Sequence, residues 1–215
     1  MSRRISHASV RQTRSMDRYG LTRQVVADAI TFAHETFDAL DLTLIGRGQG
    51  RMSEMIELAN LSAMLGNVFR SGIEQASNHA FVSNGPHKYP DLLGKAEGCS
   101  DIEIKVALET NNPKGHLVKP GPHITVRYVL GRDDGGFTLG RENRGNVVWV
   151  WDVRVGELLD AHFNVSNTAG DSGKTAVINA AGMLALEPVY FDRHRCAYKA
   201  TSKHTKALVA KFPLR

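Results

Sequence analysis

Two segments, Tyr89-Pro-Asp-Leu-Leu93 and Asp101-Ile-Glu-Ile-Lys-Val-Ala-Leu108, decide the fold that we predict for this chain. The second alternates polar and apolar residues, so on a β-strand Glu103 and Lys105 would point to one face and the apolar side chains to the other. A glycine-bearing turn separates the segments, which predicts a hairpin that brings Asp91 beside Glu103. Two carboxylates at one sheet edge repel each other unless a cation binds, and hard cations such as Mg²⁺ prefer oxygen ligands.

Pro90-Asp91 followed by Glu103-Ile104-Lys105 resembles the PD-(D/E)xK nuclease motif. The segment from Asn112 to His123, with the strand-like run Ile124 to Leu130, resembles the region after that motif in type II restriction endonucleases. The resemblance implies that Asp91, Glu103 and the Ile104 carbonyl hold Mg²⁺, and that Lys105 lies near the attacking water. It also implies cleavage that leaves 5′-phosphates. The alternative interpretation is a surface hairpin on which Glu103 and Lys105 form an ordinary ion pair.

Composition sets the class of protein. The chain has 215 residues and a net charge of +5, with a pI near 9.3, which suits one substantial core and an anionic partner. Its two cysteines share no metal-like spacing and are typical of a reducing compartment. No apolar run is as long as a membrane span, and the polar N-terminus does not resemble a signal peptide. We therefore expect a cytoplasmic protein with no membrane partner.

The chain is expected to divide into a basic N-terminal arm, residues 1–20, and a single endonuclease domain, residues 21–215. The arm carries five arginines and one acid, so it would be loosely ordered and either lie along phosphates or remain a solvated tail. Apolar stripes predict helices over Leu21 to Leu40, with Thr22 as a cap, and over Met52 to about Gln75.

Restriction endonucleases often place an extra acid from an upstream helix near the metal. Glu54 and Glu57 project toward the apolar face of the second predicted helix, and Glu74 falls nearly opposite. Glu54 is our candidate for the additional metal ligand, with Glu57 and Glu74 as alternatives. Otherwise Glu54 and Glu57 would pair with Arg47 or Arg51.

Further strands are predicted at Ile124 to Leu130 and Asn146 to Val153, and a short helix at Gly156 to Phe163. Trp149 and Trp151 are expected to pack under a helix. Strands interleaved with helices indicate an α/β or α+β domain with a central mixed sheet, and the family resemblance implies a restriction-endonuclease-like sheet flanked by helices.

The loop Gly170-Asp-Ser-Gly-Lys-Thr175 mimics a phosphate-binding loop, but its glycine spacing is wrong, so we expect no nucleotide cofactor. Two interpretations remain: a plain connection, or a loop that contacts DNA. Residues expected to contact DNA lie after the motif or in this loop: Lys114, His116, Lys119, Ser172, Lys174 and Thr175. The acid-free segment after Asp192 offers a further basic surface.

Together these features predict a Mg²⁺-dependent, sequence-specific endonuclease of the type II restriction class that acts on double-stranded DNA as a homodimer. One alternative is a repair or phage nuclease of the same fold. The other is a non-catalytic DNA-binding protein in which the hairpin is structural.

Overall fold

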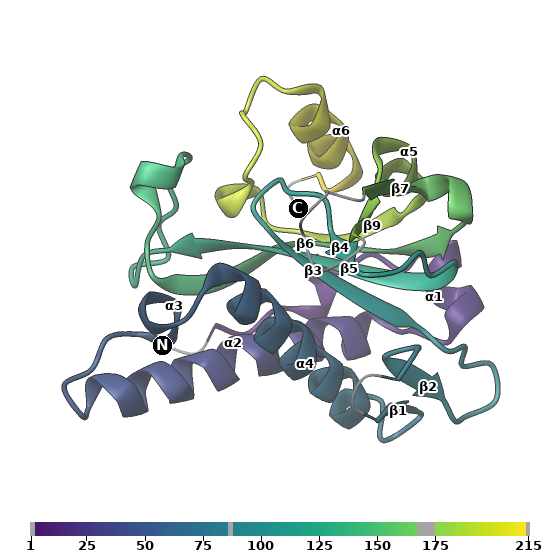
Figure 1. Ribbon diagram of the computed structural model, residues 1–215, viewed down its shortest axis with the longest axis horizontal. Helices are drawn as coiled ribbons and strands as arrows, with labels where there is room; N and C mark the ends of the chain where they lie inside the picture. The colour runs from purple at the N-terminus through teal and green to yellow at the C-terminus, as the bar shows by residue number, and fades with distance from the viewer. Residues whose placement is uncertain (1–2, 86–87, 167–174, 214–215) are drawn as a thin grey trace.

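A four-stranded mixed sheet forms the centre of the computed structural model, which describes residues 3–85, 88–166 and 175–213 (Figure 1). The strand order is β3-β5-β6-β9. Strand β3 runs parallel to β5, and the other neighbours are antiparallel. The strands are β3 (Glu103–Leu108), β5 (Gly121–Gly131), β6 (Val147–Leu158) and β9 (Glu187–Phe191). This arrangement confirms a mixed α+β domain with a mixed central sheet.

Two long helices, α2 (Arg23–Ile45) and α4 (Leu58–Ala76), cover one face of this sheet (Figure 1). Thr22 caps α2 as predicted, because its hydroxyl accepts a hydrogen bond from the Val25 amide. The helices approach closely at Gly72, where a Cβ would lie 2.9 Å from the Ala29 Cα. Ile102 and Ile104 face these helices and complete the main core.

Two helix predictions need correction. The single helix predicted over Met52 to Gln75 is two helices, α3 (Met52–Met55) and α4, because the backbone at Ile56 and Glu57 is extended. The helix predicted at Gly156 to Phe163 is wrong. There β6 continues to Leu158, and a 3₁₀ turn (Asp160–His162) leads into β7 (Phe163–Ser166). Pairing with β5 continues as far as Gly121 and Leu158, so backbone hydrogen bonds extend β6 through this region.

The opposite face carries a small sheet and two short helices (Figure 1). The small sheet has the order β4-β8-β7, with β4 at Lys114–Gly115 and β8 at Thr175–Ile178. Helices α5 (Ala180–Ala185) and α6 (Lys203–Lys211) lie on the same side. Trp151 is fully buried and packs with Leu208 of α6, so its predicted place beneath a helix is confirmed.

The N-terminal segment is packed rather than loosely ordered, and that expectation was wrong. Val10 is buried and pairs with Tyr190 of β9, so the segment extends the edge of the sheet. Met16 and Tyr19 of α1 (Arg14–Tyr19) are also buried. Composition concealed this because a few well-placed apolar residues anchor an otherwise basic segment. No helix in the described residues is long and apolar enough to cross a membrane.

A line of polar side chains crosses the sheet face that lies opposite α2 and α4. Strand pairing places Glu103 beside His123, Lys105 beside Thr125, and Arg127 beside Asp152. Side chains two apart on a strand share a face, so these residues and Arg154 lie on one side of the sheet. Six members of this line are buried: Glu103, His123, Thr125, Arg127, Asp152 and Arg154. This polar face contains the candidate site.

Candidate active site

The hairpin places Asp91 against the edge strand β3, as the sequence predicted. Leu92 and Ile102 form an antiparallel bridge with two backbone hydrogen bonds of 2.9 Å. Strand β2 (Leu92–Gly94) also pairs with β1 (Phe81–Ser83). The Ile104 amide then donates to Asp91 Oδ2 at 2.8 Å. Asp91 is therefore fixed by the backbone of the strand that carries Glu103.

The Ile104 carbonyl points to the same edge of the sheet as Asp91. The N–H and C=O of one strand residue project to the same side, and the Ile104 N–H points away from β5 toward Asp91. The side chains of Glu103 and Lys105, by contrast, rise from the polar face. The site thus combines a carboxylate at the edge, a backbone carbonyl beside it and a second carboxylate on the adjacent residue.

Glu103 has two chemically different oxygens. Its Oε1 accepts hydrogen bonds from the ammonium groups of Lys105 and Lys119, the latter at 2.7 Å. Its Oε2 is buried and has no hydrogen-bond partner among the described residues. A carboxylate oxygen in this state strongly favours a donor or a cation.

The two carboxyl groups respond differently to this environment. Burial raises the pKa of Asp91, and the nearby charge of Glu103 raises it further. Burial also raises the pKa of Glu103, but the Lys105 and Lys119 ammonium groups outweigh it and hold that pKa below its usual value. Glu103 is therefore the carboxylate that stays ionised most readily, and Asp91 is the one whose charge a cation would stabilise.

His123 is a site residue that the sequence reasoning missed. It pairs directly with Glu103 across β3 and β5, and its side chain is fully buried. Its Nδ1 lies 2.9 Å from the Gly121 carbonyl, and burial lowers its pKa to about 4. The motif-like segment that ends at His123 was visible in the sequence. The parallel pairing that brings it to Glu103 was not, because pairing between non-adjacent strands leaves no local pattern.

Tyr89 holds in place the segment that carries Lys119. Its hydroxyl donates to the Pro120 carbonyl at 2.7 Å, and the Lys119 ammonium lies 4.8 Å from the centre of its ring. Lys119 was expected to contact DNA, but in the structure it binds Glu103. The ion pair with Glu103 and the cation–π contact with Tyr89 make Lys119 part of the site.

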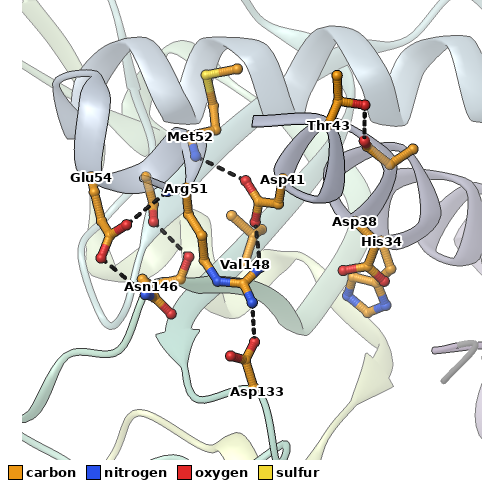
Figure 2. Close-up of polar contacts among 12 residues, drawn as sticks. His34, Asp38, Asp41, Thr43, Arg51, Met52, Glu54, Asp133, Asn146 and Val148 are labelled. Carbon is orange, nitrogen blue, oxygen red and sulfur yellow. Dashed lines mark hydrogen bonds and ion pairs between the residues drawn. The ribbon is translucent and has the colours of Figure 1, made fainter. Parts of the chain in front are cut away.

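Glu54 does not join the carboxylates, contrary to the sequence-based expectation. It accepts hydrogen bonds from the Arg51 amide at 2.7 Å and from the Asn146 side chain at 3.0 Å (Figure 2). The backbone N–H of Asn146 donates to the carbonyl of Gly131, which lies at the far end of β5. Positions 123 and 131 of that strand are roughly 25 Å apart at about 3.3 Å per residue. Glu54 closes the start of α3, where Arg51 also pairs with Asp41 and Asp133.

Of the other upstream acids, Glu74 is linked to the site through the backbone of the strand next to Asp91, and Glu57 is not. Glu57 is exposed and directly precedes α4. Glu74 accepts a hydrogen bond at 3.1 Å from the amide of Ser83, which pairs with Leu92, the neighbour of Asp91. Asp101, in the same hairpin, is exposed and accepts a hydrogen bond from the Gly94 amide at 2.9 Å, which stabilises the hairpin turn.

Some of the remaining residues predicted to contact DNA lie beside the site, and others lie outside the described residues. Lys114 and His116 are exposed on and just after β4, and the adjacent Gly115 lies against the Lys105 side chain. Thr175 begins β8 and is half-buried. Ser172 and Lys174 lie outside the described residues. Lys114 and His116 therefore border the site from the small sheet, and the loop prediction stays a prediction.

The carboxylates fit a hard cation that takes only a few of its ligands from the protein. In the part of the chain that the structure describes, no group of three or more His, Cys, Asp or Glu side chains converges on one point. Mg²⁺ commonly takes one or two carboxylates and completes its shell with water and substrate oxygens. Asp91, the buried Glu103 Oε2 and the Ile104 carbonyl meet that requirement.

No family model matches the chain, and no curated protein matches it.

Proposed function

We propose that this protein is a Mg²⁺-dependent endonuclease with a restriction-endonuclease-like fold, which cleaves double-stranded DNA at specific sequences. The observation that supports this most directly is the edge of β3. There the Ile104 amide holds Asp91 beside a buried glutamate that keeps one oxygen without a partner in the described chain. A purely structural hairpin would not need to desolvate Glu103 and leave its Oε2 unbonded.

In this proposal Asp91, Glu103 and the Ile104 carbonyl would hold Mg²⁺. The cation supplies neutralisation of the negative charge that develops on the phosphate during attack by water. Lys105 lies on the same strand face as Glu103 and is nearly buried, with 13% of its side chain exposed. Its ammonium favours hydroxide over water nearby and stabilises negative charge in a partly desolvated site.

The partner and assembly are inferred from charge and symmetry. The net charge of +5 favours a polyanion, and α6 presents exposed Lys203, Lys206 and Lys211 on the sheet side that carries the site. A symmetric homodimer suits a palindromic duplex site, since each subunit cuts one strand. The products would carry 5′-phosphates, as in the family that the motif resembles.

One observation favours the alternative of a non-catalytic DNA-binding protein. Lys119 adds a second ammonium to Glu103 Oε1, so the charge of this carboxylate is already balanced without a cation. In that case the cluster would stabilise the hairpin, and the basic surface alone would bind DNA.

Incubation of the purified protein with phage DNA in Mg²⁺ or in EDTA tests the proposal. Discrete fragments that appear only with Mg²⁺ support a restriction enzyme, and a smear indicates a nuclease with little sequence preference. Intact DNA with a gel shift overturns the nuclease proposal and supports the binding protein. Glu103→Gln, assayed in parallel, should retain the gel shift and lose the fragments, which excludes a contaminating nuclease.

A further inference from the structure

Two buried hydrogen-bond acceptors lie on neighbouring strands at the centre of the candidate site. Glu103 Oε2 and His123 Nε2 belong to directly paired residues of β3 and β5, and both side chains are on the polar face. Neither atom has a partner among residues 3–85, 88–166 and 175–213. Glu103 is 1% exposed and His123 is fully buried. Such atoms are rare in folded proteins and indicate a bound water, ion or ligand.

The hydrogen bond at the other ring nitrogen identifies the tautomer of His123. The Gly121 carbonyl can only accept, so His123 Nδ1 must carry the proton that it donates over 2.9 Å. In the neutral ring Nε2 then carries a lone pair and can only accept. The two unpartnered atoms are therefore both acceptors, and neither can satisfy the other.

The described side chains around them do not supply the donor. Lys105 and Lys119 both donate to Glu103 Oε1. Thr125, two residues along β5 from His123, has a buried hydroxyl that itself has no partner in the described chain. A small molecule with two hydrogens matches a pair of acceptors on adjacent strands, and water is the one that every aqueous site contains.

We propose that Glu103 Oε2 and His123 Nε2 accept hydrogen bonds from one buried water, and that His123 is a positioning residue that orients this water for attack on the phosphodiester. A water that donates both hydrogens to the protein directs its oxygen lone pairs away from these acceptors, toward the space where substrate would enter. Each carboxylate oxygen has two lone pairs, so Glu103 Oε2 can accept from this water and also bind Mg²⁺. The orienting role rests on the proposed nuclease function, whereas the water site itself does not.

His34 provides a matched comparison within the same protein. It is also buried and uncharged, with a pKa lowered to about 3 by burial. Its Nε2, however, accepts from the Val150 amide at 3.0 Å, and its Nδ1 lies 3.3 Å from the Arg3 carbonyl. His34 is thus satisfied by protein groups alone, so it serves as the structural control.

Single-turnover cleavage of DNA measures the orienting role. His123→Asn keeps a donor near Nδ1 but removes the acceptor at Nε2, so the rate constant should fall about 10²-fold while DNA affinity stays within about 3-fold. His123→Gln carries its amide near the Nε2 position and should restore most of the rate. A His34→Gln control should lower stability without changing the rate of the folded fraction. Equal rates for His123→Asn and wild type would overturn the orienting role.

Nitrogen-15 NMR of the histidine rings tests the water site without reference to activity. We expect His123 as the Nδ1–H tautomer, with cross-relaxation between its ring protons and a long-lived water that is absent at His34. An Nε2–H tautomer, or no water contact at His123, overturns the proposal. A wild-type protein that shows this water and leaves DNA intact in Mg²⁺ would support the water site, while overturning the nuclease assignment and the orienting role with it.

Discussion

Two charged clusters lie on the same face of the central sheet, and they differ in whether their atoms are satisfied. The edge cluster comprises Asp91, Glu103, Lys105 and Lys119. The central cluster comprises Arg127, Asp152, Arg154 and Tyr198. In the central cluster Arg127 donates to Asp152 through Nε at 2.9 Å and Nη2 at 2.6 Å, and to the Tyr198 hydroxyl through Nη1. Arg154 also binds Asp152 and the Met183 carbonyl. None of the buried atoms without a described partner belongs to this cluster.

The difference separates a structural ion pair from a site that is prepared for a ligand. Desolvated charges are tolerated when their partners are protein groups with good geometry, as around Asp152. The edge cluster also desolvates a carboxylate, yet within the described chain it leaves Glu103 Oε2 and the neighbouring His123 Nε2 unbonded. Burial without satisfaction lowers stability, so the edge cluster is where we expect function.

The largest effect should come from the carboxylates of the edge cluster. Glu103→Gln and Asp91→Asn should each reduce Mg²⁺-dependent cleavage to background, because each removes a charged oxygen ligand. DNA binding should be unchanged or tighter, since less negative charge faces the phosphate. Cleavage assays with gel shifts measure both properties.

Asp101→Asn is the control for these two variants. Asp101 lies in the same hairpin but is exposed and binds only the Gly94 amide in the described structure. It should therefore cleave at nearly the wild-type rate. Near wild-type cleavage by Glu103→Gln would mean that the edge cluster is no more functional than the central one.

Lys105→Ala should lower the single-turnover rate by about 10²–10⁴, because it removes the ammonium that favours hydroxide at the site. Lys119→Ala sharpens the test, since Lys119 donates to the same Glu103 oxygen from a different segment. A much smaller effect of Lys119→Ala would show that Lys105 acts on the water. Equal effects would show that both lysines only balance the charge of Glu103.

The sequence predicted the two long helices and three of the four central strands, β3, β5 and β6, because these depend on local patterns. The alternation around Ile102 and Ile104 predicted an edge strand with an apolar face, and that face packs on α2 and α4. The cap at Thr22 predicted where α2 begins. The break at Ile56 was missed, because the apolar pattern of a helix continues through it. The packing of Val10 against Tyr190 was missed because it joins distant parts of the chain.

The candidate site was predicted only in part, because local patterns link only some of its residues. Asp91 and Glu103 are linked by one short hairpin, so local reasoning brought them together. His123 reaches Glu103 only through parallel pairing, and Lys119 reaches it from the connection between the paired strands. Glu54 was misplaced because helical periodicity gives a direction around an axis but no position along the sheet.

The central cluster should respond in stability rather than in catalysis. Asp152→Ala should lower the free energy of unfolding by about 3–5 kcal/mol, because it leaves two arginines buried without their carboxylate. Chemical denaturation measures this, and cleavage corrected for the folded fraction should stay near wild type. Glu157→Gln, which breaks the exposed pair with Arg18, should cost less than about 1 kcal/mol. A catalytic defect in folded Asp152→Ala would extend the functional site across the sheet.

The smallest effect should come from Glu54, which the sequence placed at the metal and the structure places at the start of α3. Glu54→Ala removes an acceptor for the Arg51 amide and for Asn146, so unfolding should become easier by about 0.5–2 kcal/mol, as for the loss of a helix cap. Cleavage and Mg²⁺ dependence should match wild type, because roughly 25 Å of β5 separates this end of the sheet from Glu103. Glu57→Ala, at an exposed neighbouring position, controls for charge removal and should change stability less. Thermal unfolding measures the loss of stability, and Mg²⁺ titrations of cleavage measure the Mg²⁺ requirement. A folded Glu54→Ala protein with a raised Mg²⁺ requirement would mean that both ends of the polar face serve the reaction, and the contrast between the two clusters would then no longer identify the site.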